Sequence, residues 1–159
     1  MRAATPLGAA WLAILLLAGC VGARHEPPRA SQGREIAAIA ASLVGARYQF
    51  GGADGAGFDC SGLALYVHER VGLAIPRTAA GQERAAHAVP IAQLAPGDLV
   101  FFHMRAHSVD HVGIYAGEGR FIHAPRAGAA VGYADLRSGF YARHLASAGR
   151  FWGAAAATR

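Results

Sequence analysis

Two stretches in the first half of the chain carry apolar residues at helical spacing. The first runs from a predicted N-cap at Ser31 to a predicted C-cap at Gly45. The second runs from Cys60 to Gly72, and Asp59 in front of it is a predicted N-cap. The apolar positions are Ile36, Ile39, Ala40 and Leu43 in the first stretch, and Leu63, Tyr66, Val67 and Val71 in the second. Because each set falls on one face of a helix, the pattern predicts two amphipathic helices.

The second half of the chain carries short apolar or alternating segments. Residues 48–59, between the two helix patterns, are a glycine-rich loop without an apolar period. Residues 99–102 are an apolar run, and residues 111–117, HVGIYAG, alternate between the two sides of a strand. Similar segments follow turns at 120–125 and 128–133. They predict a small antiparallel sheet, and helices followed by strands indicate an α+β fold.

The length and the ends of the chain set the expected domain organisation. With 159 residues the chain has room for one domain with a core, which we expect at residues 32–153. Residues 1–19 have the layout of a signal peptide, in which Arg2 precedes a short apolar run. Residues 154–159 are an alanine-rich tail.

The segment LAGC at residues 17–20 resembles the bacterial lipobox. In that motif the signal peptide is cut just before the cysteine, which then carries lipid. The resemblance implies acyl chains on Cys20, enough to anchor the protein stably to a membrane, and a tether at residues 20–31. An ordinary signal peptide cut nearby is the alternative. Because Val21 follows and not Asp, we expect the periplasmic face of a bacterial outer membrane.

The charge of the chain favours an anionic partner. All 15 basic residues are arginines, and the formal net charge is +5. The arginines are spread along the chain without a block, and no nucleic-acid-binding motif accompanies them. We therefore expect contact with an anionic polymer or surface and not with a nucleic acid.

Cys60 is a candidate nucleophile because of its place at the head of the second predicted helix. Unpaired backbone N–H groups and the helix dipole favour a thiolate there, and the same N–H groups can receive an oxyanion. If lipid takes Cys20, Cys60 has no other cysteine in the chain to pair with. The alternative is a small buried hydrophobic residue, the commonest role of a free cysteine.

A thiol nucleophile needs a base, and the chain has eight histidines. His111 begins the alternating segment and His123 lies in the neighbouring one, so adjacent strands can bring them together. One would take the proton and the other would orient it. The chain has no Asn for this role, and Asp135 is a further group that could lie behind His123. Ordinary surface or core histidines remain the alternative.

A zinc site is a second interpretation of these histidines. His103, His107 and His111 are spaced by four and would share one face of a helix. However, the segment lies between two predicted strands and contains no HExxH motif. A loop with incidental histidines fits the pattern better.

Six motifs together resemble the NlpC family of cell-wall cysteine peptidases. They are YQFGG, FDCSGLALYV, IPRTAAGQ, LAPGDLVFF, HVGIYAG and FIHAP, in the order of the family, between Ile36 and Trp152. The resemblance implies a papain-like fold, with Cys60 as nucleophile, His111 as general base and His123 as the orienting residue. It also implies that Tyr48 assists at the oxyanion site.

The resemblance further assigns Asp59, Ser61, Arg77 and Gln82 to shaping the site or contacting substrate. Together these features predict a lipid-anchored endopeptidase that cuts amide bonds in peptidoglycan stem peptides and needs no metal or organic cofactor. The D-Ala to diaminopimelate cross-link is the expected bond, with the D-Glu to diaminopimelate bond as the alternative. A silent wall-binding lipoprotein, an amidase or acyltransferase of the same fold, and a metal-dependent hydrolase are the rival functions. The sequence names no adaptor or regulator.

Overall fold

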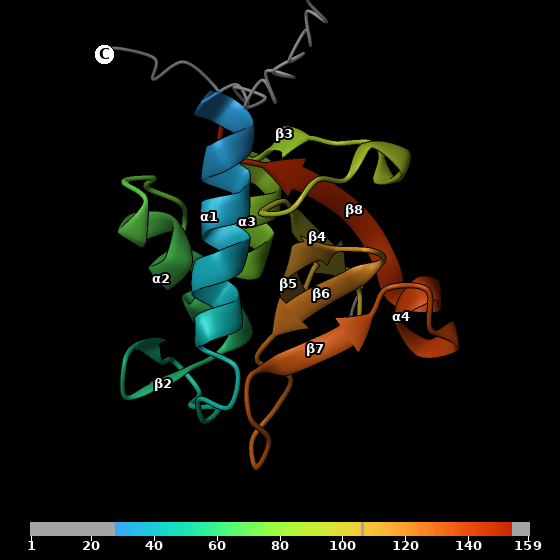
Figure 1. Cartoon of the computed structure of the whole chain (residues 1–159). Coiled ribbons are helices and arrows are strands. Elements are labelled where there is room, and N and C mark those ends of the chain that lie inside the picture. Colours follow the sequence, from blue (N-terminus) through green and yellow to red (C-terminus); the bar gives the residue numbers. More distant parts are fainter. Residues whose placement is uncertain (1–27, 106, 154–159) are drawn as a thin grey trace, which may run out of the picture.

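The structure is a computed structural model that describes residues 28–105 and 107–153, and it combines helices with an antiparallel sheet (Figure 1). The helices are α1 (Pro28–Ser42), α2 (Cys60–Arg70), α3 (Ala79–Ala85) and α4 (Gly139–His144), with a 3-10 turn at Ile91–Gln93. The strands are β1 (Ala53–Asp54), β2 (Gly57–Phe58), β3 (His87–Ala88), β4 (Leu99–Phe102), β5 (His111–Gly117), β6 (Arg120–His123), β7 (Gly132–Asp135) and β8 (Leu145–Arg150). The predicted α+β class is confirmed.

Six strands form one antiparallel sheet in the order β3-β8-β4-β5-β6-β7, and β1 and β2 form a separate hairpin. Helices α1 and α2 pack against one face of the large sheet at β5. Because β5 and β6 are antiparallel neighbours, the start of β5 and the end of β6 lie at the same edge of the sheet. This edge is where His111 and His123 meet.

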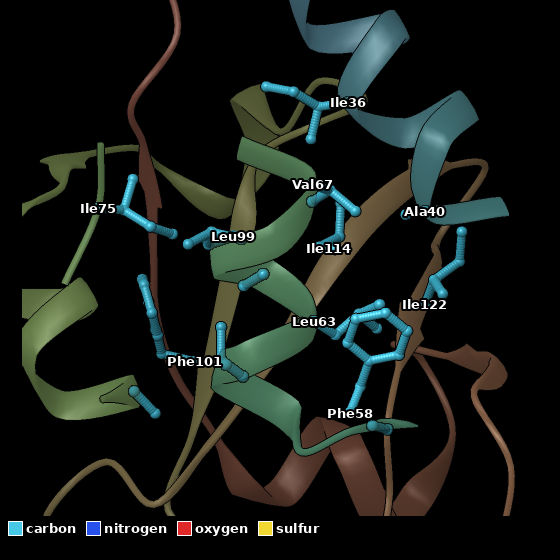
Figure 2. Close-up of a cluster of buried hydrophobic side chains, with 14 of the residues drawn as sticks. Ile36, Ala40, Phe58, Leu63, Val67, Ile75, Leu99, Phe101, Ile114 and Ile122 are labelled. Atoms are coloured by element: carbon cyan, nitrogen blue, oxygen red, sulfur yellow. The ribbon is translucent and has the colours of Figure 1, made fainter. Parts of the chain in front are cut away.

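The core fills both faces of the sheet. Between the helices and the sheet, Ile36, Leu63 and Val67 pack against strand residues such as Leu99 and Ile114 (Figure 2). A smaller cluster covers the other face and consists of Val100, Phe102, Phe121, Leu136 and Ala148. Every residue of β4 is buried, which explains why its sequence is a continuous apolar run and not an alternating one.

The boundaries of α1 differ from the predicted ones. The helix begins at Pro28, so Ser31 lies in its first turns and is not the N-cap. Proline suits the start of a helix because no amide donor is needed there. The helix ends at Ser42, and Gly45 closes the following turn with φ +93° while its N–H donates to the Val131 carbonyl at 2.9 Å.

The second predicted helix is confirmed as α2. Its N-cap is Asp59, whose side chain accepts from the Gly62 N–H at 2.7 Å, and Gly72 follows its end with φ +78°. Strand β7 begins at Gly132, later than the predicted segment 128–133, because a turn closes first from Arg126 to Ala129. No helix among the described residues is long and apolar enough to cross a membrane. The predicted signal peptide, Cys20 and the tail at 154–159 lie outside the described residues.

Candidate active site

The thiol of Cys60 is held at the head of α2 by a network around Asp59. Asp59 accepts from the helix N–H of Gly62, and its other oxygen pairs with the Arg77 guanidinium at 2.6 Å. Arg77 also donates to the hydroxyl of Ser61 at 2.9 Å. These bonds hold the pKa of Asp59 below its usual range, although burial opposes them. Arg77 thus binds both chain neighbours of Cys60, Asp59 and Ser61, and this fixes the first turn of α2.

The loop before β1 packs closely on the same turn. Gly62 faces the carbonyl oxygen of Gly52 so closely that a Cβ atom at position 62 would overlap it. Gly52 in turn accepts a hydrogen bond from the Asp59 N–H at 3.0 Å. Tyr48 lies in this loop and lines the same cavity as Cys60. The two sequence motifs YQFGG and FDCSG thus form one structural unit.

His111 and His123 form a hydrogen-bonded pair at the sheet edge. Nε2 of His111 lies 2.8 Å from Nδ1 of His123, and both side chains are buried, with exposed fractions of 6% and 4%. His111 also lines the cavity that contains Cys60. The prediction that neighbouring strands bring these two histidines together is confirmed.

With Nδ1 of His111 as the base, one assignment of protons satisfies both contacts of the histidine pair. Because Nε2 of His111 is engaged by His123, Nδ1 is the nitrogen that His111 has left to accept a proton, and His111 and Cys60 line the same cavity. Nε2–H of His111 then donates to Nδ1 of His123, and Nε2–H of His123 donates to the Tyr141 hydroxyl oxygen at 3.4 Å. Tyr141 was not predicted, because it lies on the short helix α4, which the apolar pattern does not reveal. Only the Ser138 N-cap in front of α4 marks it in the sequence.

Asp135 does not lie behind His123, so that expectation is wrong. It occupies the far end of β7, opposite Arg120, whereas His123 is opposite Gly132. Its carboxylate binds Arg137 at 3.1 Å on the surface. The strand register separates the two residues.

Burial governs the ionisation of the site. It raises the pKa of the Cys60 thiol, and the Asp59 charge adds to this, while the backbone N–H groups of Val112, Ser61 and Cys60 itself act in the opposite direction. Burial also lowers the pKa of His111 to about 4 and that of His123 to about 3. The pKa of Tyr48 is raised, first by burial and then by the nearby Cys60 and Asp59. Tyr48 therefore keeps its proton and can donate it to an oxyanion.

The cavity at this site has a volume of about 910 Å³. Its lining includes the predicted residues Tyr48, Asp59, Cys60, Ser61, Arg77 and His111. It also includes Phe50, Arg105, Asp110, Arg126, Phe140 and Tyr141, which the sequence did not single out. All six lie in loops or on α4, where apolar periodicity carries no signal.

Gln82 has one of its two expected roles. Its side chain is fully buried, and its Nε2 donates to the carbonyls of Ser61 at 2.9 Å and Pro76 at 2.8 Å. It does not line the cavity, so of the two expected roles, shaping the site or contacting substrate, the structure supports the first. Gln82 instead ties α3 to the turn that carries Cys60.

The zinc interpretation required a helix that carries His103, His107 and His111 on one face, and the structure has no helix at these positions. Residues 103–105 and 107–110 are neither helix nor strand, and His103 and His107 are exposed there, while His111 begins β5 and pairs with His123. Within the described ranges, no group of three or more His, Cys, Asp or Glu residues is placed to hold a metal ion.

A thiol at a helix head, facing histidines on an antiparallel sheet, defines the papain-like class of folds. A family model described as NlpC/P60 matches residues 45–150. The chain belongs to the NlpC/P60 family.

Relatives and solved structures agree with this membership. The chain is 40% identical over 112 residues to murein DD-endopeptidase MepH of Escherichia coli, which covers 67% of this chain and 41% of that protein. It is 34% identical over 118 residues to gamma-D-glutamyl-L-lysine dipeptidyl-peptidase of Bacillus subtilis, covering 73% and 40%. A crystal structure of an NlpC/P60 family protein from Bacillus cereus superimposes with a TM-score of 0.71 and 35% identity, covering 75% of this chain and 40% of that one. The chain thus spans about 40% of the length of these relatives.

Proposed function

We propose that this protein is a cysteine endopeptidase that hydrolyses amide bonds in the stem peptides of peptidoglycan. The observation that carries the proposal is the hydrogen bond of 2.8 Å between His111 and His123, together with the cavity that His111 and Cys60 both line. The alternative of ordinary surface or core histidines does not account for a thiol at a helix N-terminus in the same cavity. The printed names of the relatives, a DD-endopeptidase and a dipeptidyl-peptidase among them, support cell-wall peptides as the substrate class.

The geometry supports acyl transfer in two steps. Nδ1 of His111 takes the thiol proton as the Cys60 sulfur attacks the amide carbonyl carbon. Backbone N–H at the head of α2, with the Tyr48 hydroxyl, stabilises the oxyanion. His111 then gives its proton to the departing amine, and a thioester on Cys60 remains. A water molecule, deprotonated by His111, attacks the thioester, and the products are a carboxylic acid and the free thiol.

We further propose that the bond cut is the D-Ala to diaminopimelate cross-link. The name of MepH, a DD-endopeptidase 40% identical over the aligned region, supports this choice. The name of the dipeptidyl-peptidase points to the alternative bond at D-Glu, within the stem. The products of digestion separate the two.

Anchoring through lipid on Cys20, at the periplasmic face of the outer membrane, is part of the proposal. Because α1 begins at Pro28, the segment between Cys20 and the helix is residues 21–27, shorter than the expected tether. Fully extended, it reaches at most about 25 Å. The lipobox resemblance supports the anchor.

The test is digestion of purified peptidoglycan by the full chain in mild detergent, beside Cys60→Ala, with products identified by liquid chromatography and mass spectrometry. We expect the native chain to remove cross-linked dimers and the variant to leave them intact. Shortened monomer stems would place the cut at D-Glu, and released intact stems would indicate an amidase. Unchanged peptidoglycan with a folded native chain would favour a binding protein. Loss of activity in iodoacetamide but not in a chelator would separate a thiol enzyme from a metal-dependent one.

A further inference from the structure

Two arginines that the proposed mechanism does not use lie at the cavity. Arg105 belongs to the loop that leads into β5, and Arg126 belongs to the loop that follows β6. Both line the cavity and both are exposed. Because the start of β5 and the end of β6 share one sheet edge, the two loops leave the sheet at the edge where His111 and His123 lie.

The acidic groups of the cavity are already engaged. Asp59 is bound by Arg77 and by the head of α2. The two carboxylate oxygens of Asp110 accept from the backbone N–H of Met104 at 2.6 Å and of Arg105 at 3.0 Å. In the described part of the chain, neither Arg105 nor Arg126 forms an ion pair through its side chain. Their charges remain available for a ligand.

Asp110 gives Arg105 a fixed place. The backbone N–H groups of Met104 and Arg105 donate to its carboxylate, and Asp110 directly precedes His111 in the chain. These bonds therefore hold the backbone of Arg105 close to the start of β5. The charge of Arg105 acts on the pKa values of two groups of the site, His111 and Tyr48. Burial lowers the pKa of His111, the Asp110 charge opposes this, and the Arg105 charge adds to it; at Tyr48 the Arg105 charge opposes the effect of burial, which raises the pKa.

We infer that Arg105 and Arg126 form a carboxylate-binding subsite that selects stem peptides with free carboxylates over amidated ones. The inference rests on the proposed function and names what its substrate must carry. A stem peptide offers two carboxylates near the expected bonds, on D-Glu and on diaminopimelate, and each can be masked as an amide. The planar guanidinium binds a carboxylate through two parallel hydrogen bonds, and an amide in its place loses the charge and half of the acceptors.

The test uses synthetic cross-linked stem dimers in three forms: free carboxylates, amidated D-Glu and amidated diaminopimelate. Turnover is measured with the full chain in detergent and with Arg105→Gln and Arg126→Gln. The matched control is Arg70→Gln, an exposed arginine at the other end of the helix that begins with Cys60. We expect the native chain and the control to turn over the dimer with free carboxylates roughly 10-fold more efficiently than at least one of the amidated dimers, mainly through KM. At least one of the two cavity variants, Arg105→Gln and Arg126→Gln, should lose that preference, so that it turns over the free and the amidated dimers at similar rates.

The two amidated forms identify which carboxylate is bound. Equal turnover of all three dimers by the native chain would overturn the inference, as would a preference that survives in both cavity variants. Binding of the same dimers to Cys60→Ala, measured by calorimetry, separates this result from failure of the proposed function. Carboxylate-dependent binding without turnover by the native chain would support the subsite and reject the peptidase. Binding that depends on salt but not on amidation would overturn the subsite, because the arginines would then only attract anions in general.

Discussion

Burial sets the resting charges of Cys60 and His111. His111 is buried and Cys60 is half-buried, and the partial loss of water raises the pKa of the thiol and lowers that of the imidazole to about 4. Both directions favour a neutral thiol beside a neutral imidazole. The position at the head of α2 alone favours the opposite, a thiolate with a depressed pKa. In this site we therefore expect the proton to leave sulfur as the substrate is attacked.

Alkylation of Cys60 tests this resting state. Because its pKa is raised, the rate with iodoacetamide should increase only at a pH above the ordinary thiol range. The rate is measured from pH 5 to 10 on the peptide that carries Cys60, identified by mass spectrometry, with Cys60→Ser as the control for reaction elsewhere. An inflection below neutral pH would show a preformed thiolate–imidazolium pair and contradict the expectation.

The role of His123 is tested by two substitutions that differ in one acceptor. His123→Leu removes the group that receives the His111 Nε2–H, whereas His123→Gln can still accept from it through its carbonyl oxygen. We expect the Leu variant to lose roughly 10²-fold or more in kcat and the Gln variant to lose less, with similar KM values in both. Steady-state kinetics on the stem dimer measure this. Equal loss in the two variants would mean that His123 supports the site by packing alone.

At the scale of elements, the site depends on how the glycine-rich loop sits on α2. Gly62 belongs to the first turns of the helix, where alanine is ordinarily favoured by about 1 kcal/mol. Here its position lacks space for a Cβ atom because the carbonyl of Gly52 lies against it. Close backbone contact therefore outweighs helix propensity, and it holds the Tyr48 loop beside Cys60.

Gly62→Ala should destabilise the protein in spite of the better helix propensity. We expect a loss of roughly 1–3 kcal/mol in the free energy of unfolding, measured with urea, and a lower kcat because the loop shifts. Gly55→Ala is the matched control, because a Cβ atom there meets nothing within 4 Å. A Gly62→Ala variant as stable as Gly55→Ala would show that the loop yields without cost.

The elements with strong periodicity were predictable from the sequence, and those fixed by tertiary contacts were not. Helix α2 and strands β4, β5 and β6 have clear apolar patterns and were expected. Strand β8, LASAGR, has small residues without alternation, and it is a strand because β3 and β4 pair with it on both sides. Helix α4 is too short for a period.

The reacting residues were predictable because they lie in motifs with local structure. Cys60 follows an N-cap, and His111 and His123 mark the ends of adjacent strands. Tyr141 and Arg126 reach the cavity only through packing, so no local pattern indicates them. For Gln82 the motif left two roles open, and only its burial in the fold selects shaping of the site over contact with substrate.

At the scale of the whole molecule, the proposed anchor and the site lie at opposite ends of α1. The cavity is lined by the loop after the C-terminal end of the helix, whereas the tether would join its N-terminal end (Figure 1). A helix of 15 residues is about 22 Å long. An anchor at Cys20 would therefore join the end of α1 that lies away from the cavity.

Three buried histidines make the fold sensitive to acid. His111 and His123 belong to the site, and His68 is fully buried in the core, with Nδ1 donating to the Ala64 carbonyl at 2.8 Å. Within the described residues, Nε2 of His68 has no hydrogen-bond partner. Burial lowers its pKa to about 4. Each of the three resists protonation when folded and accepts it when unfolded.

His68→Leu should reduce the loss of stability in acid. Because the folded pKa lies below the unfolded value of 6.5, the contribution of neutral His68 is complete above pH 6.5 and is lost as the pH falls toward 4. At 1.36 kcal/mol per pH unit, this amounts to roughly 3 kcal/mol over that window. Urea unfolding at pH 7.5, 6, 5 and 4 measures it, with the exposed His87→Gln as the control. Parallel pH profiles for His68→Leu and the native chain would show that the core admits the imidazolium, or water beside it, without unfolding.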